Sequence, residues 1–349
     1  MSCSKTGIEY QGSSLNGLFA QRLNLVRPSF LRVLSDIARF NRKGIEAANS
    51  GELRDGRTVR EFLQECGTGQ GFADRYLVPM AAAIWSSKPD AILDFPAEFM
   101  LGFFANHGLM QLRDRPQWRT IQNGCRKYVE ALLQPIKEQV RLRCPVESVI
   151  RSHDQVTIQP ADGPSEEFDQ VVFAAHADQT LELLTDATDH ERQILSSFPY
   201  HPNEAVLHTD TSLLPKRRRA WASWNYRIPP GDERGASVTY DLSRLQNHDS
   251  PSPILLTLNE SESVDPAKTI RRFTYHHPAY SIDSIVAQQS FEQISGHNRT
   301  HFCGAYWGYG FHEDGVNSAL AVARHFGIGL EACTVASTKD KYHIAATSR

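Results

Sequence analysis

One stretch near the end of the chain limits the fold more than any other. Residues 301–303 are apolar enough for a short buried strand, and three glycines follow between positions 304 and 310. From 316 to 326 the apolar residues recur at helical spacing, which gives a helix one face to bury. Units of strand, glycine turn and helix are common in α/β proteins, and we expect that class here.

The same stretch brings backbone N–H groups close to whatever lies above the turn. Glu313 and Asp314 fall in the first turn of the expected helix, where carboxylates suit the positive end of the helix dipole. Bare N–H groups at such a place suit an anion, for example a pyrophosphate or the carbonyl edge of a reduced flavin. The pattern alone leaves two interpretations open, a ligand-binding turn and a purely structural turn.

Composition excludes several classes of protein. The chain of 349 residues is long enough for two domains, and its net charge of -3 argues against a general nucleic-acid binder. No apolar run approaches the roughly 18–20 residues that cross a bilayer, and the first residues lack the apolar core of a secretory signal. Six scattered cysteines without C-x-x-C spacing indicate no metal site and no disulfide framework. We therefore expect a cytoplasmic protein.

The first third of the chain has mainly helical patterns. We expect helices over 31–40, 58–66, 72–85 and 96–107, each delimited by proline or glycine. The apolar residues 76–85 fit either a hydrophobic core or the wall of a substrate cavity, which Met110 and Trp118 would also line. The only glycine-rich look-alike of a dinucleotide motif, residues 67–71, follows a helical pattern and not a strand, so we interpret it as a helix stop.

From residue 116 onward the patterns change to strands. Residues 118–133 predict a strand, a turn at Gly124 and a helix, and residues 155–159 and 168–176 predict a β-hairpin. Short helices over 178–185 and 190–197 come next. The strands expected after them lie near 204–209, 220–227, 237–242, 254–258 and 271–275.

Two features in this later part of the sequence can each be interpreted in two ways. The basic run 216–219 is either a solvated loop or a site for an anionic lipid surface or acidic substrate. Aromatic and imidazole side chains gather on strands that we expect to be neighbours, where they would form either core or cavity walls. These are Trp221, Trp224, Tyr226, Tyr275, His276 and His277.

The motifs near the end resemble the flavin-containing amine oxidase superfamily. In that family the sequence motif Phe-Ala-Gly is followed, after a spacer, by Gly-x-x-Glu-Gly-Ala at the start of a helix. This chain has Phe302-Cys-Gly-Ala, then Gly310-Phe-His-Glu-Asp-Gly-Val, so that Asp314-Gly315 replaces Gly-Ala. Segments at 13–21, 74–80, 113–118, 220–226 and 275–278 are similar to bacterial NAD/FAD-binding proteins found beside cyclopropane fatty acid synthases.

The resemblance runs from about residue 8 to 328 and implies a mixed α/β (α+β) fold. We expect a truncated FAD/NAD(P)-binding domain of the amine oxidase type and a substrate domain of antiparallel sheet and helices. The truncation is expected because the family's opening strand and G-x-G-x-x-G turn have no counterpart in this sequence. The boundaries that follow are 1–115 (helical part of the substrate domain), 116–185 (remaining FAD-binding segment), 186–297 (substrate sheet), 298–328 (C-terminal FAD-binding strand, turn and helix) and 329–349 (disordered tail).

The resemblance also implies a cofactor and its contacts. The cofactor would be FAD, and the reaction a hydride transfer from a substrate C–H bond to flavin N5. In the family a Pro-Val dipeptide presents its backbone to the adenine, which makes Val146 a candidate, and Ala175 ends a strand that returns towards the cofactor. The remaining candidates come from the terminal motif and are Gly304, Ala305, Gly310, Phe311, His312 and Glu313.

Catalytic residues are less well indicated. Glu204 stands where many amine oxidases have a lysine near N5, so amine oxidation in particular is in question. Trp224, Tyr275 and His276 are weaker candidates, and His176 fits either a titrating or a structural role. The substrate is unassigned and would be a small molecule or a lipid, with a fatty-acyl chain as one option. A cyclopropane fatty acid synthase would be the functional neighbour.

Two readings other than catalysis stay open. Without the first dinucleotide-binding unit, we expect FAD binding to be weak or lost, because the phosphate contacts of that unit are missing. The chain would then be a non-catalytic remnant or a lipid- or partner-binding accessory protein.

Overall fold

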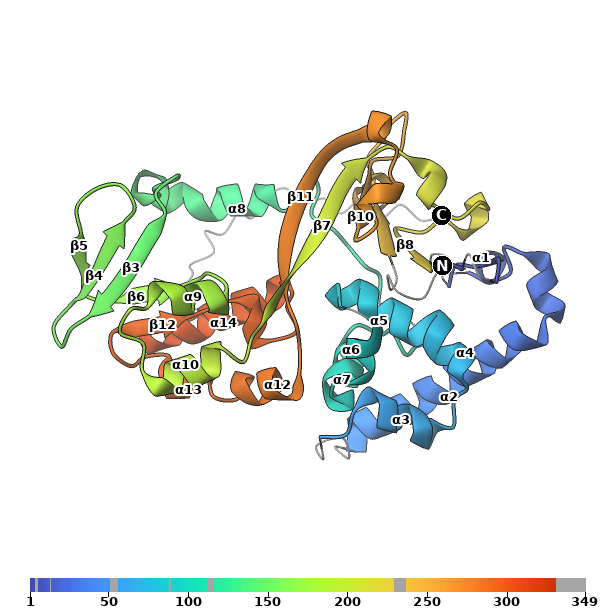
Figure 1. Ribbon diagram of the computed structural model, residues 1–349, viewed down its shortest axis with the longest axis horizontal. Helices are drawn as coiled ribbons and strands as arrows, with labels where there is room; N and C mark the ends of the chain where they lie inside the picture. Colours follow the sequence, from blue (N-terminus) through green and yellow to red (C-terminus); the bar gives the residue numbers. More distant parts are fainter. Residues whose placement is uncertain are drawn as a thin grey trace, which may run out of the picture. The chain divides into compact units, whose positions relative to one another are not determined.

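The computed structural model describes residues 1–3, 6–12, 14–50, 56–87, 89–111, 116–228 and 237–330. These form two compact units (Figure 1). The first unit combines Met1–Cys144 with Ser197–Ala287, and the second combines Pro145–Ser196 with Gln288–Arg349. The expected tail at 329–349 lies outside the described residues from position 331, as do residues 113–115 of the motif at 113–118.

The helices of the first unit come mainly from its N-terminal part. α3 begins at a capping box between Thr58 and Glu61 and ends at Gly67, whose φ of +62° suits glycine. The helix stop expected at residues 67–71 is thus confirmed, while the loop expected there is short because α4 begins at Gln70. The helices are α1 (Leu15–Leu18), η1 (Arg22–Val26), α2 (Pro28–Ser50), α3 (Val59–Cys66), α4 (Gln70–Phe72), η3 (Ala73–Leu77), α5 (Val78–Trp85), α6 (Pro89–Leu93), α7 (Ala97–Asn106), α8 (Arg126–Leu133) and η4 (Gln134–Gln139).

One strand prediction in this region is wrong. Residues 118–123 are exposed and form no strand, because no neighbouring strand pairs with them within the described part of the chain. The turn at Gly124, with φ of +83°, and the following helix α8 are confirmed.

The first unit also contains a seven-stranded sheet in the order β11-β7-β10-β9-β8-β1-β2. All neighbouring strands are antiparallel except β1 and β8, which run parallel. The strands are β1 (Ser2–Cys3), β2 (Ile8–Glu9), β7 (Tyr200–His208), β8 (Trp224–Ile228), β9 (Ser237–Asp241), β10 (Leu255–Leu258) and β11 (Thr269–Pro278). Between them lie η5 (Thr211–Leu213), η6 (Arg218–Ala220), α11 (Leu242–Gln246), η8 (Ser261–Ser263) and η9 (Pro266–Lys268).

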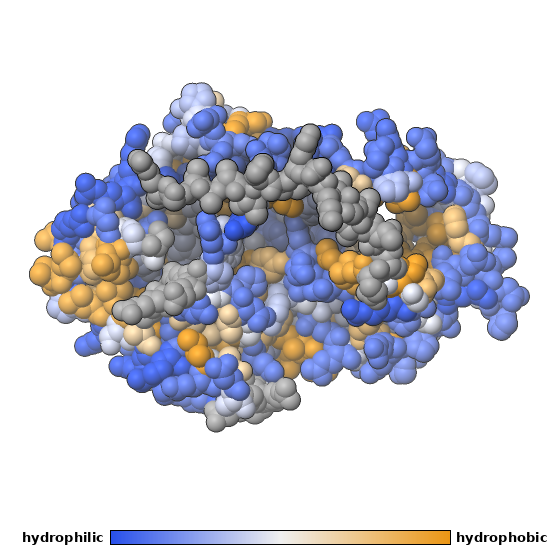
Figure 2. Space-filling view, turned by 180° about the vertical axis from the view of Figure 1, so that it is seen from behind, coloured by the Kyte–Doolittle hydropathy of each residue, from blue (hydrophilic) through white to orange (hydrophobic). Residues whose placement is uncertain are grey.

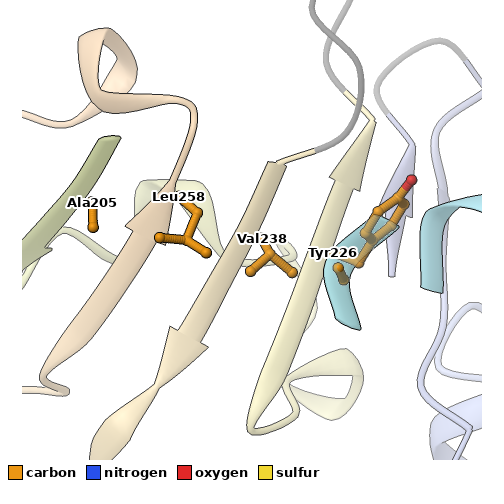
Figure 3. Packing of buried hydrophobic residues seen from close by; sticks show 5 residues of the cluster. Ala205, Tyr226, Val238 and Leu258 are labelled. Atoms are coloured by element: carbon orange, nitrogen blue, oxygen red, sulfur yellow. The ribbon is translucent and has the colours of Figure 1, made fainter. Parts of the chain in front are cut away.

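The two faces of this sheet differ in chemistry, because successive side chains of a strand point to opposite faces. One face is apolar and packs against Ala83 of α5; its central row is Ala205, Leu258, Val238 and Tyr226 (Figure 3). The other face carries buried polar side chains, namely Asn225, Thr239, Thr257 and His208. Hydrogen bonds join the last three, at 2.7 Å between the threonine hydroxyls and 2.8 Å between His208 Nε2 and Thr257 Oγ1.

The second unit contains two small sheets. β6 (Val171–Phe173) and β12 (Thr300–Phe302) form a parallel pair, in which Phe173 stacks on Phe302. The three-stranded sheet is antiparallel and consists of β3 (Val146–Arg151), β4 (Val156–Pro160) and β5 (Glu166–Phe168). The helices are α9 (Ala177–Leu183), α10 (Asp189–Leu195), α13 (Phe291–Ile294), η10 (Ala305–Trp307) and α14 (His312–His325), while α12 (Ile282–Gln288) spans the boundary between the units.

The described residues contain neither a candidate membrane span nor a candidate metal cluster. No described helix has both the length and the apolar character of a bilayer-spanning segment. No group of three or more His, Cys, Asp or Glu side chains in the described part of the chain has the geometry of a metal site.

Candidate functional site

The terminal strand, turn and helix form as the sequence predicts, in β12, η10 and α14. The turn folds back on the helix, because Gly304 N–H donates to Ser318 Oγ at 2.9 Å. Ser318 Oγ in turn donates to the carbonyl of Gly315 at 2.8 Å. The N–H groups of Gly308 and Gly310 both donate to Ala305 O at 3.1 Å, and Gly310 has a φ of +94°. Hydrogen bonds therefore fix the loop between strand and helix.

The start of α14 gathers backbone N–H groups on one side of the loop. Asp314 accepts the N–H of Phe311 at 2.9 Å, and the first turn of any helix has N–H groups that no carbonyl of the same helix accepts. Within the described residues, Ala305 N has no hydrogen-bond acceptor. A Cβ atom added to Gly315 would lie 4.0 Å from Ala305 N, so glycine at 315 keeps this N–H approachable. The geometry suits a partly negative, flat group.

The other predicted flavin contacts of this unit lie in two places. Ala175 follows β6, the parallel neighbour of β12, so Ala175 and Gly304 follow the carboxyl ends of adjacent strands. Val146 begins β3 in the separate three-stranded sheet, where it pairs with Pro160 and is 36% exposed. His176 is the N-cap residue of α9, and its Nδ1 lies 4.0 Å from the carboxylate of Asp178. Ala175 and Gly304 thus follow the same edge of one sheet, and Val146 lies on another sheet of the same unit.

A pocket of about 450 Å³ lies within the first unit. Its wall is mainly apolar and aromatic, and Arg75 is the one charged side chain among the described residues that line it. α5 and η3 contribute Tyr76, Pro79, Met80 and Ala83, while the other residues of 76–85 include the buried core positions Leu77, Val78 and Trp85. The segment thus supplies both core residues and pocket-wall residues, whereas Met110 and Trp118 do not line this pocket. The remaining lining residues are Met1, Tyr10, Gln11, Gly12, Leu18, Leu34, Ile37, Ala38, Leu109, Ala222, Trp224, Tyr226 and Val238.

The pocket wall contains two residues that the sequence analysis did not single out, Tyr10 and Arg75. Tyr10 OH donates to the carbonyl of Arg75 at 3.0 Å, and burial raises the pKa of Tyr10. The pKa of Tyr226 is also raised by burial, so both phenols stay protonated at neutral pH. Arg75 lies in the segment 74–80 that carries part of the family resemblance, whereas Tyr10 belongs to no motif, and only the packing of distant segments brings the two together.

The candidate catalytic residues do not form one cluster. Trp224 lines the pocket and makes an edge contact with Tyr240 at 5.5 Å between ring centroids. Glu204 lies on the polar face of the sheet, where it pairs with Arg272 at 3.1 Å and accepts a hydrogen bond from Ser261. Glu204 and Trp224 thus point to opposite faces.

Tyr275 and His276 are also distant from Trp224 along the sheet. Both lie on β11 and are exposed, and β7, β10 and β9 separate that strand from β8. The expectation that the aromatic set occupies neighbouring strands is wrong, because the chain order of strands differs from their order in the sheet.

Comparison with known proteins bears on the family and the fold. The sequence pattern of the family described as "Flavin containing amine oxidoreductase" matches residues 3–325. No match was found among curated protein sequences. Similar solved structures include the CLA-producing fatty acid isomerase from P. acnes, with a TM-score of 0.58 and 16% identity over 86% of this chain and 75% of that chain.

Two oxidases have comparable similarity. A double mutant of putrescine oxidase has a TM-score of 0.59 and 9% identity over 85% of this chain and 76% of that chain. Cyclohexylamine oxidase from Brevibacterium oxydans IH-35A has a TM-score of 0.52 and 14% identity over 78% of this chain and 69% of that chain. At these identities the structures show the fold, and they confirm the expected mixed α/β architecture. Because the family pattern extends over nearly the whole chain, the protein belongs to the flavin-containing amine oxidoreductase family.

Proposed function

We propose that this chain is an FAD-dependent oxidoreductase that acts on an apolar substrate with a carboxylate end, such as a fatty-acyl chain. The observation that carries the proposal is the pocket of the first unit. Its volume of about 450 Å³ is within the range of about 300–1,000 Å³ typical of small-molecule sites. An apolar wall with a single cation, Arg75, suits a long apolar molecule with one negative end.

The terminal loop of the second unit is the proposed flavin contact. Its fit rests on the approachable Ala305 N–H, the first turn of α14 and the missing side chain at Gly315. When bound, the flavin would supply a hydride acceptor at N5, and the chain's own residues would hold and orient it. The N–H groups at the start of α14 would stabilise negative charge beside them, and they are held in place before any reaction.

The pocket residues would orient the substrate and exclude water. Tyr10, Trp224 and Tyr226 supply large apolar surfaces, and Arg75 would pair with the carboxylate. Support for a fatty-acyl substrate comes also from the similar fold of a protein named as a fatty acid isomerase. We propose no proton-transfer residue, because Glu204 faces away from the pocket wall.

The same pocket supports a second function. An apolar wall with one cation can bind a lipid without any redox step, so we keep a lipid-binding accessory protein without redox activity as the alternative proposal.

Flavin binding is tested by titration of the purified chain with FAD, followed in the visible absorption spectrum. Although the sequence predicts weak binding, we expect a yellow complex with one flavin per chain once FAD is in excess. The variant Gly315→Leu places a side chain over Ala305 N and should weaken binding roughly 5- to 150-fold, the equivalent of about 1–3 kcal/mol for a lost buried hydrogen bond.

The matched control is Ala319→Leu, because Ala319 is an exposed position of the same helix, α14, and leucine is a good helix former. Equal flavin binding by wild type and Gly315→Leu would rule out the terminal loop as the contact. A wild-type chain that takes up no flavin at all would favour the accessory protein.

Substrate class is tested by calorimetric titration with a long-chain fatty acid and with the alcohol of the same length. The acid should bind more tightly, and Arg75→Met should weaken acid binding about 10- to 100-fold while leaving the alcohol unchanged, as expected for a hydrogen bond to a charged group. Arg42→Met, at an exposed arginine of α2 that does not line the pocket, serves as control. If the acid and the alcohol bind the wild-type chain equally well, the carboxylate assignment fails.

A further inference from the structure

The segment that joins α1 to α2 turns apolar side chains outward and a polar one inward. Asn24 of η1 is fully buried, and neither its amide nitrogen nor its amide oxygen has a partner among the described residues. Its neighbours Leu23 and Val26 are 73% and 75% exposed. A segment that faced only water would adopt the reverse arrangement, since burying an unpaired amide is unfavourable and burying leucine is favourable.

The exposed apolar residues form one patch. α1 is tied to η1, because Arg22 Nη2 donates to Asn16 Oδ1 at 2.6 Å, and η1 leads directly into α2. In Figure 2 apolar surface gathers at the left edge, over the end of the first unit where Figure 1 shows α1. Contiguous patches of this kind mark docking surfaces. The apolar patch consists of Leu15, Leu23, Leu25, Val26 and Leu31.

Basic residues border the apolar patch. Residues 10–35 contain three arginines and no aspartate or glutamate, although the whole chain has a net charge of -3. The exposed run Lys216–Arg219 lies beside α1, because η6 contacts that helix. The run is fixed there by Glu9, whose carboxylate accepts the N–H groups of Lys216 at 2.8 Å and Arg217 at 3.1 Å. The basic border is thus the exposed Arg22, Arg32 and residues 216–219.

We propose that the apolar patch and the basic border together dock the first unit on an anionic lipid bilayer. Exposed leucines and valine would enter the boundary between headgroups and acyl chains, and the cations would meet anionic headgroups around them. α1 and α2, which carry part of the apolar patch, also contribute Leu18 and Leu34 to the wall of the pocket. An apolar surface surrounded by positive charge beside an apolar pocket matches the chemistry of a bilayer.

The test is co-sedimentation of the full chain with vesicles of phosphatidylcholine alone and of phosphatidylcholine mixed with phosphatidylglycerol. We expect binding to the mixed vesicles, weakened by high salt. Leu23→Ser/Val26→Ser should abolish most of the binding. Arg217→Ala and Arg218→Ala should each weaken it about fivefold, as expected for a cation near an anionic surface.

Two controls match these changes. Ile282→Ser/Val286→Ser removes two exposed apolar side chains from α12, which are 45% and 58% exposed. Arg42→Ala removes an exposed arginine from α2, ten residues or about 15 Å along the helix from Arg32. Both controls should bind vesicles as the wild type does, and circular dichroism should show that every variant folds.

Three results would overturn the proposal. They are equal binding to neutral and mixed vesicles, unchanged binding by Leu23→Ser/Val26→Ser, and a lipid-free dimer that this double variant dissociates. The last result would make a second copy of the chain the occupant of the patch. Because these variants leave the terminal loop and Arg75 intact, a chain that takes up FAD but ignores vesicles contradicts this inference alone.

Discussion

At the scale of single residues, His208 has both ring nitrogens engaged inside the first unit. Its Nδ1 accepts the N–H of Asp210 at 3.0 Å, so the ring proton belongs on Nε2, which donates to Thr257 Oγ1 at 2.8 Å. Burial lowers the pKa of His208, and a weaker attraction to Asp210 opposes the shift. In the second unit, burial and the nearby His325 lower the pKa of His301, which hydrogen-bonds Gln170 at 2.6 Å. The folded chain therefore favours two neutral histidines.

The lowered pKa values of His208 and His301 predict how the stability of the folded chain depends on pH. Above pH 6.5, the ordinary pKa, both histidines are neutral in the folded and unfolded states. As the pH falls below 6.5, the unfolded chain takes up protons that the folded chain resists, so the free energy of unfolding decreases. The variant His208→Asn, which keeps an acceptor for Asp210 N–H, should flatten this dependence when unfolding in urea is measured between pH 7 and 5 (roughly the range in which histidine titrates).

The control for this prediction is His153→Gln, because the His153 side chain is 98% exposed and should leave the profile unchanged. Asp210 does not interfere. Burial would raise its pKa, but the N–H groups of Asp265 and Ser212 and the ammonium of Lys268 outweigh burial and lower the pKa to about 2. Its contribution is present above pH 3.8 and is lost only as the pH falls towards 2. If the free energy of unfolding falls equally steeply with pH in His208→Asn and in wild type, His208 is not a source of the pH dependence.

At the scale of elements, Arg151 connects several parts of the second unit. From the end of β3 it donates to both oxygens of Glu191 in α10, to Asp186 before that helix and to Thr300 in β12. The side chains of Arg151 and Glu191 are only 3% and 2% exposed. Burial opposes both charges, but the hydrogen bonds between the two outweigh it, so the pKa of Glu191 is lowered and that of Arg151 raised. Glu191 also closes the capping box of α10 with Thr188.

Removal of one partner should therefore destabilise the unit strongly. Arg151→Met leaves a buried carboxylate without its cation, and we expect a loss of about 3–5 kcal/mol in the free energy of unfolding. Adding Glu191→Gln removes the stranded charge and should restore part of that loss, which thermal or urea unfolding of the single and double variants would show. If the two losses simply add, the pair is not coupled.

Elements differ in how well the sequence predicts them. α14 and β12 were predictable because their pattern is local: apolar residues at helical spacing, glycines before them and acids in the first turn. The strand expected at 118–123 was not, because a strand needs a partner and only distant residues decide whether one is available. The role of Arg151 could not be predicted either, because its partners lie up to 149 positions away in the sequence.

At the scale of the whole molecule, the order of strands in the sheet was the hardest feature to foresee. Five of the seven strands were expected from their composition, yet the placement of β11 beside β7 depends on pairing between distant residues. That order separates Tyr275 and His276 from Trp224. The sequence could propose a terminal loop, but it could not place Arg75 and Tyr10 on one pocket wall.

The sheet order has a further consequence, for solubility. Its two outermost strands are those whose backbones have a neighbour on one side only within the sheet. β2 is just two residues long, while the long strand β11 carries Arg271 and Arg272 and ends in Pro278. Short length, positive charge and proline each discourage edge-to-edge association of strands. The protein thereby limits the growth of intermolecular β-structure at the borders of its largest sheet.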